Sequence, residues 1–83
     1  MALRRNLADA LAQLKRFGDA AEQYDIMIKD YPGQSMLHSR RGMLLMQMER
    51  FIDARADFEE ALRIDQNNME ARQHLQMLIN LGH

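Results

Sequence analysis

The sequence predicts an all-α fold built from two helix–turn–helix units and a fifth, single helix. The first observation is that the chain resembles itself at an offset of 34 residues. The second is that five segments space their apolar residues three or four apart, as one face of a helix does. The third is that the connections are short, which makes neighbouring helices antiparallel. We therefore expect one repeat domain over 1–83, divided into 1–34, 35–68 and a last helix over 69–83.

Each expected helix has its own apolar stripe. The first, over 3–14, has Leu3, Leu7, Ala10, Leu11 and Leu14. The second, over 20–31, has Ala20, Tyr24, Met27, Ile28 and Tyr31. The third, over 37–48, has Leu37, Leu44, Leu45 and Met48, and the fourth, over 54–62, has Ala54, Phe58, Ala61 and Leu62. The fifth, over 71–79, has Ala71, Leu75, Leu78 and Ile79. No segment alternates apolar and polar residues for long, so we expect no strand.

Residues with turn or capping chemistry separate these stripes. We expect a turn at 17–19, with Asp19 as the N-cap of the second helix. Pro32, followed by glycine, is expected to end that helix. Asn68 is expected to cap the fifth helix, and Gly82 is expected to end it in the left-handed conformation.

Small and aromatic residues alternate at set points of both units. Ala20 precedes Tyr24 by one helical turn, and Ala54 precedes Phe58 in the same way. A small residue beside a large one lets two helices approach while the ring fills the next gap. We therefore expect both rings in the core, and we interpret Gly42 as a glycine packed between helices.

The composition excludes several classes of function. The net charge is -1, so we expect no nucleic-acid partner. No apolar run approaches membrane-spanning length, so we expect no membrane partner. The chain has no cysteine, which excludes a thiolate zinc site and a thiol nucleophile and fits a reducing, cytoplasmic location.

These residues resemble the tetratricopeptide repeat, a helix–turn–helix unit of 34 residues. The residues of the first unit that match are Leu7, Ala8, Leu11, Phe17, Ala20, Tyr24 and Pro32. Those of the second unit are Gly42, Leu45, Phe51, Ala54, Phe58 and Ala61. The resemblance implies a right-handed superhelical α-solenoid whose concave face is lined by the first helix of each pair, with the fifth helix as a solvating cap. Gln66 departs from the pattern, because the family has proline there.

The first helix of each pair has a second face, one residue away from the core stripe. We expect it to form a methionine-rich groove that binds a peptide or a helix of a partner protein. The candidate binding residues are Arg5, Asp9, Met36, Arg40, Met43, Met46, Gln47, His74 and Met77. The alternative is that these methionines only fill gaps in the stack.

Some members of this family grip the carboxylate of heat-shock chaperone tails with five basic and amide residues. The matching positions here are Arg5, Asp9, Arg40, Glu70 and His74. Only Arg5 keeps the character of its counterpart, and Asp9 and Glu70 would repel a carboxylate. We therefore expect no such clamp.

Nothing in the sequence predicts catalysis or a cofactor. Glu70 and His74 lie one turn apart, but two ligands without a third are a weak metal site. Ser35 and Ser39 have no identifiable base. A short array also leaves two other hypotheses open: a structural piece that self-associates through its open ends into a homo-oligomer, or a designed or truncated chain without its own partner.

Overall fold

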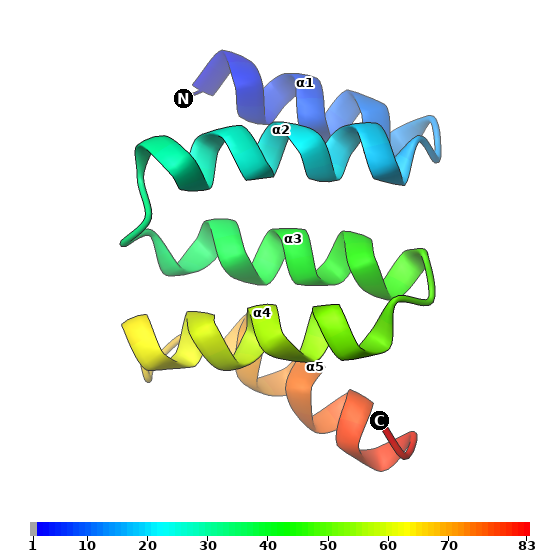
Figure 1. Ribbon diagram of the computed structural model, residues 1–83, viewed down its shortest axis with the longest axis vertical. Helices are drawn as coiled ribbons and strands as arrows, with labels where there is room; N and C mark the ends of the chain where they lie inside the picture. The colour runs from blue at the N-terminus through cyan, green and yellow to red at the C-terminus, as the bar shows by residue number, and fades with distance from the viewer. Residues whose placement is uncertain (1) are drawn as a thin grey trace.

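The computed structural model describes residues 2–83, which form five helices and no strand, so the predicted all-α helical repeat fold is confirmed. The helices stack in chain order, each packed against the next, and α5 also contacts α3 (Figure 1). They are α1 (Ala2–Gln13), α2 (Phe17–Asp30), α3 (Ser35–Gln47), α4 (Phe51–Ile64) and α5 (Met69–Asn80). Within 2–83, no helix has the length and apolar character needed to cross a membrane.

The second helix of each pair begins three residues earlier than expected, so the turn predicted at 17–19 is helical. The N-cap positions of α2 and α4 are Arg16 and Arg50, and neither side chain caps its helix. The prediction of Asp19 as an N-cap is therefore wrong; its carboxylate lies in the first turn and accepts a hydrogen bond from Arg16 Nε at 2.8 Å. An acid in this turn still interacts favourably with the helix dipole. The prediction for Asn68 is confirmed, because its side chain accepts from the Ala71 amide at 3.0 Å.

Three helices end in the same left-handed turn. Lys15, Glu49 and Gly82 have φ angles of 61°, 59° and 88°. After each of them, the next amide bonds back to a carbonyl five residues earlier, as from Arg16 to Leu11 at 2.8 Å. This is a Schellman ending, in which glycine is the favoured residue. The prediction for Gly82 is confirmed, while α1 and α3 end the same way without glycine.

The core consists of two apolar clusters, one formed by α1, α2 and α3 and the other by α3, α4 and α5. Tyr24 is 3% exposed in the first cluster and Phe58 is 0% exposed in the second, as predicted. Ala20 and Ala54 are both fully buried. A Cβ atom on Gly42 would lie 2.8 Å from the Phe58 ring, so glycine is required there for α3 and α4 to approach this closely.

The apolar stripe of the first helix is largely exposed, contrary to its predicted role in the core. Leu3 is 87% exposed, whereas Leu37, at the same point of the second unit, is 2% exposed. Leu37 packs in the first core cluster, between its own helix and the preceding pair, and Leu3 has no preceding pair within residues 2–83. Leu7, Leu14 and Ile79 are exposed for the same reason, because α1 and α5 are the outermost helices.

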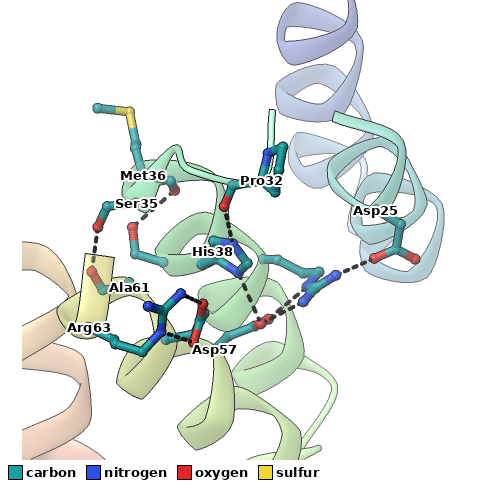
Figure 2. A network of polar contacts seen from close by, with 11 residues as sticks. Asp25, Pro32, Ser35, Met36, His38, Asp57, Ala61 and Arg63 are labelled. Atoms are coloured by element: carbon teal, nitrogen blue, oxygen red, sulfur yellow. Dashed lines mark hydrogen bonds and ion pairs between the residues drawn. The ribbon is translucent and has the colours of Figure 1, made fainter. Parts of the chain in front are cut away.

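An ion network ties the two pairs together on the side of α2 and α4. Arg41 on α3 donates to both oxygens of the buried Asp57 at 2.8 and 2.7 Å, and to Asp25 at 3.0 Å. His38 Nε2 donates to the Pro32 carbonyl at 3.3 Å, and its other ring nitrogen faces Asp57 (Figure 2). The hydrogen bonds to Asp57 raise the pKa of Arg41. A guanidinium thus bridges α2, α3 and α4.

Candidate functional site

A hollow of about 230 Å³ lies between α1 and α3, with α2 as its floor. Four of the nine predicted binding residues line this hollow: Asp9, Arg40, Met43 and Gln47. The other lining residues are Ala8, Ala12, Phe17, Tyr24 and Leu44. It opens on the face formed by the first helices of the pairs, α1, α3 and α5, which we call the groove face. The hollow has the size of a side chain rather than of a drug-like ligand.

Small residues on α1 keep this hollow open. Ala8 and Ala12 lie one helical turn apart, so neither extends far from the helix. Ala12 corresponds to Met46 in the second unit, and Asp9 corresponds to Met43. Met43 and Met46 pack against the second core cluster. The first unit therefore has short side chains where the second has two long apolar ones.

The charge of Arg40 is largely offset within the chain. Its Nε lies 3.1 Å from Glu70 Oε1, so an ion pair joins α3 to α5 across the groove face. Both atoms are buried, and neither makes a well-aligned hydrogen bond. This pairing offsets the positive charge that Arg40 would otherwise offer to an anionic ligand.

Tyr24 is a lining residue that the sequence analysis placed only in the core. Burial raises the pKa of its phenol, and the Asp9 carboxylate raises that pKa further, while Arg40 and Arg5 act in the opposite direction. These charges therefore converge on one phenol beneath the hollow. The sequence does contain a hint of this role, because the first unit has Tyr24 where the second has Phe58. A buried hydroxyl group usually needs a polar group nearby, which points to a polar site beside Tyr24.

His74 is positioned by contacts other than one with the Glu70 carboxylate. Its Nδ1 donates to the backbone carbonyl of Glu70 at 2.7 Å, and its ring stacks on Phe58 with centroids 5.5 Å apart. The Glu70 carboxylate is turned to Arg40 instead. Within residues 2–83, no group of three or more metal-ligating side chains is arranged to hold an ion.

The remaining predicted binding residues are spread over the groove face. Arg5 and Met36 are exposed, and Met46 is half-buried against the second core cluster. Met77 is exposed on α5, where it lines a separate shallow hollow with Gln73 and Leu81. The structure thus brings together the central residues of the predicted site and leaves its ends apart.

A larger hollow, of about 690 Å³, lies on the opposite side between α2 and α4. Most of its acidic side chains are already engaged: Asp25 and Asp57 with Arg41, and Asp53 with Arg50 at 2.6 Å. Internal pairing of this kind leaves little charge for a ligand. We therefore place the candidate site in the smaller hollow, where predicted binding residues gather.

Comparison with known proteins gives the same architecture. The family model described as tetratricopeptide repeat matches residues 35–68. RNA polymerase II-associated protein 3 of Xenopus laevis is 29% identical over 73 residues, which are 88% of this chain and 11% of that protein.

Two solved structures are similar over nearly the whole chain. One is the first tetratricopeptide domain of Spaghetti (RPAP3) bound to the HSP90 peptide SRMEEVD, with a TM-score of 0.87 and 26% identity. The match covers 96% of this chain and 64% of that one. The other is the first such domain of human RPAP3, with a TM-score of 0.87 and 27% identity over 94% of this chain and 61% of that one.

Proposed function

We propose that the chain is a non-catalytic protein-interaction domain that binds a peptide segment of a partner on its groove face, because residues 35–68 match the tetratricopeptide repeat model and two tetratricopeptide domains share the fold over nearly the whole chain. One side chain of that peptide enters the hollow between α1 and α3. The observation that carries this proposal is the hollow itself, whose walls are mostly apolar and whose mouth has the polar groups of Asp9, Arg40 and Gln47. Such a mixture gives affinity through burial and orientation through a few polar contacts.

The proposed ligand is apolar or amphipathic rather than an acidic chain terminus. The similar domain of Spaghetti is bound to a peptide that ends in Glu-Glu-Val-Asp. In this chain Arg40 is already paired with the Glu70 carboxylate, and Asp9 adds a negative charge at the hollow. A terminal carboxylate would meet repulsion where it needs a counter-ion. We therefore expect the peptide SRMEEVD to bind weakly here, which isothermal titration calorimetry would measure.

Filling the hollow tests the proposed site. The substitution Ala12→Met places at this point the residue that the second unit has at Met46, so the fold has a precedent for it. The matched control is Ala10→Met, an exposed position on the same helix. Ligands would come from a phage-displayed library of random peptides selected on the wild-type domain, and affinities from fluorescence anisotropy of the enriched peptides.

We expect Ala12→Met to weaken binding by about tenfold or more, because it removes the space for the anchoring side chain. Ala10→Met should bind as the wild type does, and both variants should melt near the wild-type temperature. Undiminished binding by a folded Ala12→Met variant would place the site elsewhere.

The exposed ends of the stack favour a second candidate function, which is assembly with further copies of the chain. Leu3 and Leu7 on α1 and Leu14 directly after it are exposed, as are Ile79 on α5 and Leu81 at its C-cap. Contiguous apolar side chains at a surface are typical of interaction sites. Sedimentation velocity over a range of concentrations tests this idea: the mass should rise with concentration and return to that of a monomer in Leu3→Lys or Leu81→Lys. A concentration-independent monomer would refute it.

A further inference from the structure

We infer that the hollow between α1 and α3 selects a cationic side chain with an aliphatic stem, a lysine or an arginine, on the bound peptide. This inference rests on the proposed function and names the anchoring residue of the ligand. Three features of the hollow carry it: its charge, its walls and its counterpart in the second unit.

One of the two charged side chains that line the hollow has no ion pair within residues 2–83. Two charged side chains line the hollow, Asp9 and Arg40. Arg40 is paired with Glu70 at 3.1 Å, whereas Asp9 forms no ion pair with any residue in 2–83. Asp9 is therefore the charged lining group without an ion pair, and the guanidinium of Arg5, one turn earlier on α1, does not line the hollow. A cation placed there gains Coulomb energy that a neutral group does not.

The walls suit the stem of such a side chain. Ala8, Ala12, Phe17, Met43 and Leu44 supply apolar surface. Lysine and arginine bury their methylene groups along apolar surface and keep the charged head at a polar edge. At the mouth, Asp9 and the amide oxygen of Gln47 are available acceptors for that head. A neutral apolar side chain would cover the same walls but would desolvate Asp9 without a partner.

The second unit lacks both requirements. Met43 and Met46 stand where the first unit has Asp9 and Ala12, so the acid is replaced and both positions carry long side chains that pack against the second core cluster. His74 replaces Arg40 there and is stacked on Phe58. The preference for a cation is therefore assigned to the first unit alone.

The experiment compares residues at the anchor position of the ligand. The peptide most enriched in the library selection is synthesised with lysine, norleucine or glutamate at the position whose alanine substitution costs most affinity. Norleucine has the stem of lysine without its charge. Each peptide is titrated by calorimetry against the wild type, Asp9→Asn, Glu70→Gln and the control Asp30→Asn, which changes an exposed acid at the end of α2.

We expect the lysine peptide to bind the wild type about tenfold more tightly than the norleucine peptide, with glutamate the weakest. Asp9→Asn should bring lysine and norleucine to within about twofold of each other, whereas Asp30→Asn should keep the preference. Glu70→Gln releases Arg40, so it should weaken the lysine peptide and strengthen the glutamate peptide.

Equal binding of the lysine and norleucine peptides, or a lysine preference that survives Asp9→Asn, would overturn the inference. If Ala12→Met nevertheless abolishes binding, the proposed function stands without it. If no peptide is enriched, or Ala12→Met binds every enriched peptide normally, the proposed function fails and the inference fails with it.

Discussion

The two helical pairs follow one template, yet one leaves an opening where the other is filled. In the first pair, Asp9 and Ala12 border a hollow; in the second, Met43 and Met46 at the same repeat positions pack against the core. The backbone frame is shared, because Tyr24 and Phe58 are buried in both pairs. The difference indicates that the length of two side chains on the first helix determines whether this point of a unit packs against the core or borders a hollow.

The pairs differ in a second way, on the opposite side of the stack. The second unit has Arg41 and Asp57 where the first has Leu7 and Gln23. Arg41 reaches α2 and α4 through Asp25 and Asp57, so this ion network joins the two pairs. Leu7 is exposed at the outer edge and joins nothing comparable within residues 2–83. The second pair, α3 and α4, thus combines apolar packing with a buried carboxylate, and its stability should depend on the pairing of Asp57 with Arg41.

The largest expected loss of stability comes from replacing Arg41 with leucine, the residue that the first unit has at this position as Leu7. Arg41→Leu leaves the Asp57 carboxylate buried without its main partner. Removing one member of a buried pair is costly, so we expect a loss of about 3 kcal/mol in the free energy of unfolding, measured by urea denaturation.

The double variant Arg41→Leu with Asp57→Gln copies both residues of the first unit and removes the unpaired charge. It should recover most of the loss, because replacing both members of a buried pair is often close to neutral. If Arg41→Leu alone kept wild-type stability, the ion network would contribute nothing to the stability of the second pair.

The next effect concerns the closest approach of two helices. Gly42→Ala would place a Cβ atom 2.8 Å from the fully buried Phe58 ring. Overpacking costs about 1–3 kcal/mol, and the gain in helix propensity offsets about 1 kcal/mol, so we expect a net loss of about 1 kcal/mol. Urea denaturation would measure this loss.

Gly18→Ala is the matched control for this substitution. Its added Cβ atom would lie 3.9 Å from the Met48 sulfur, an ordinary contact, so Gly18→Ala should stabilise α2 slightly. Replacing Phe58 with leucine should reduce the cost of Gly42→Ala, because the ring is the obstacle. Stabilisation by Gly42→Ala would mean that the ring moves aside freely.

Much of the fold follows from the sequence, because it depends on local pattern. The apolar spacing predicts all five helices. The N-cap at Asn68 and the left-handed turn at Gly82 are predicted because asparagine and glycine favour these positions. The starts of α2 and α4 are missed because Lys15 and Glu49 adopt the left-handed conformation, which their residue types do not indicate. Exposure of Leu3 is missed because burial of an apolar stripe depends on a neighbouring helix, which no local pattern reports.

The sequence predicts the central residues of the candidate site but not its charge pairing. Asp9, Arg40, Met43 and Gln47 share a face by helical spacing, and the structure gathers them at one hollow. The pairing of Arg40 with Glu70 joins two helices that are not consecutive, so it needs the tertiary arrangement of α3 and α5. The inferred preference for a cation depends on this pairing, so the sequence alone could not suggest it.

A smaller effect tests the turns that the two pairs share. Lys15 and Glu49 hold positive φ angles that cost a residue with a Cβ atom about 1–2 kcal/mol. Glycine removes this cost but adds chain entropy to the unfolded state, so Lys15→Gly and Glu49→Gly should each stabilise by about 0.5–1 kcal/mol. Thermal unfolding would measure the gain, and Lys29→Gly, inside α2, should destabilise instead. Destabilisation by both turn variants would refute the assignment.

The smallest effect is a loss of stability at alkaline pH that only Tyr24, and not Phe58, can cause. Burial and the nearby Asp9 carboxylate raise the pKa of Tyr24 above its ordinary value of about 10. As pH rises past that value, the phenol ionises first in the unfolded chain, which then binds fewer protons than the folded one. The free energy of unfolding is therefore unaffected below about pH 10 and falls above it.

Tyr24→Phe gives the first unit the ring of the second and removes this dependence. Urea denaturation from about pH 8 to about pH 11 should show a shallower decline for Tyr24→Phe than for the wild type. Tyr31→Phe changes an exposed ring and should follow the wild-type curve. Parallel curves for the wild type and Tyr24→Phe would mean that the phenol reaches solvent freely, and the floor of the hollow would then be more open than its burial in the first core cluster indicates.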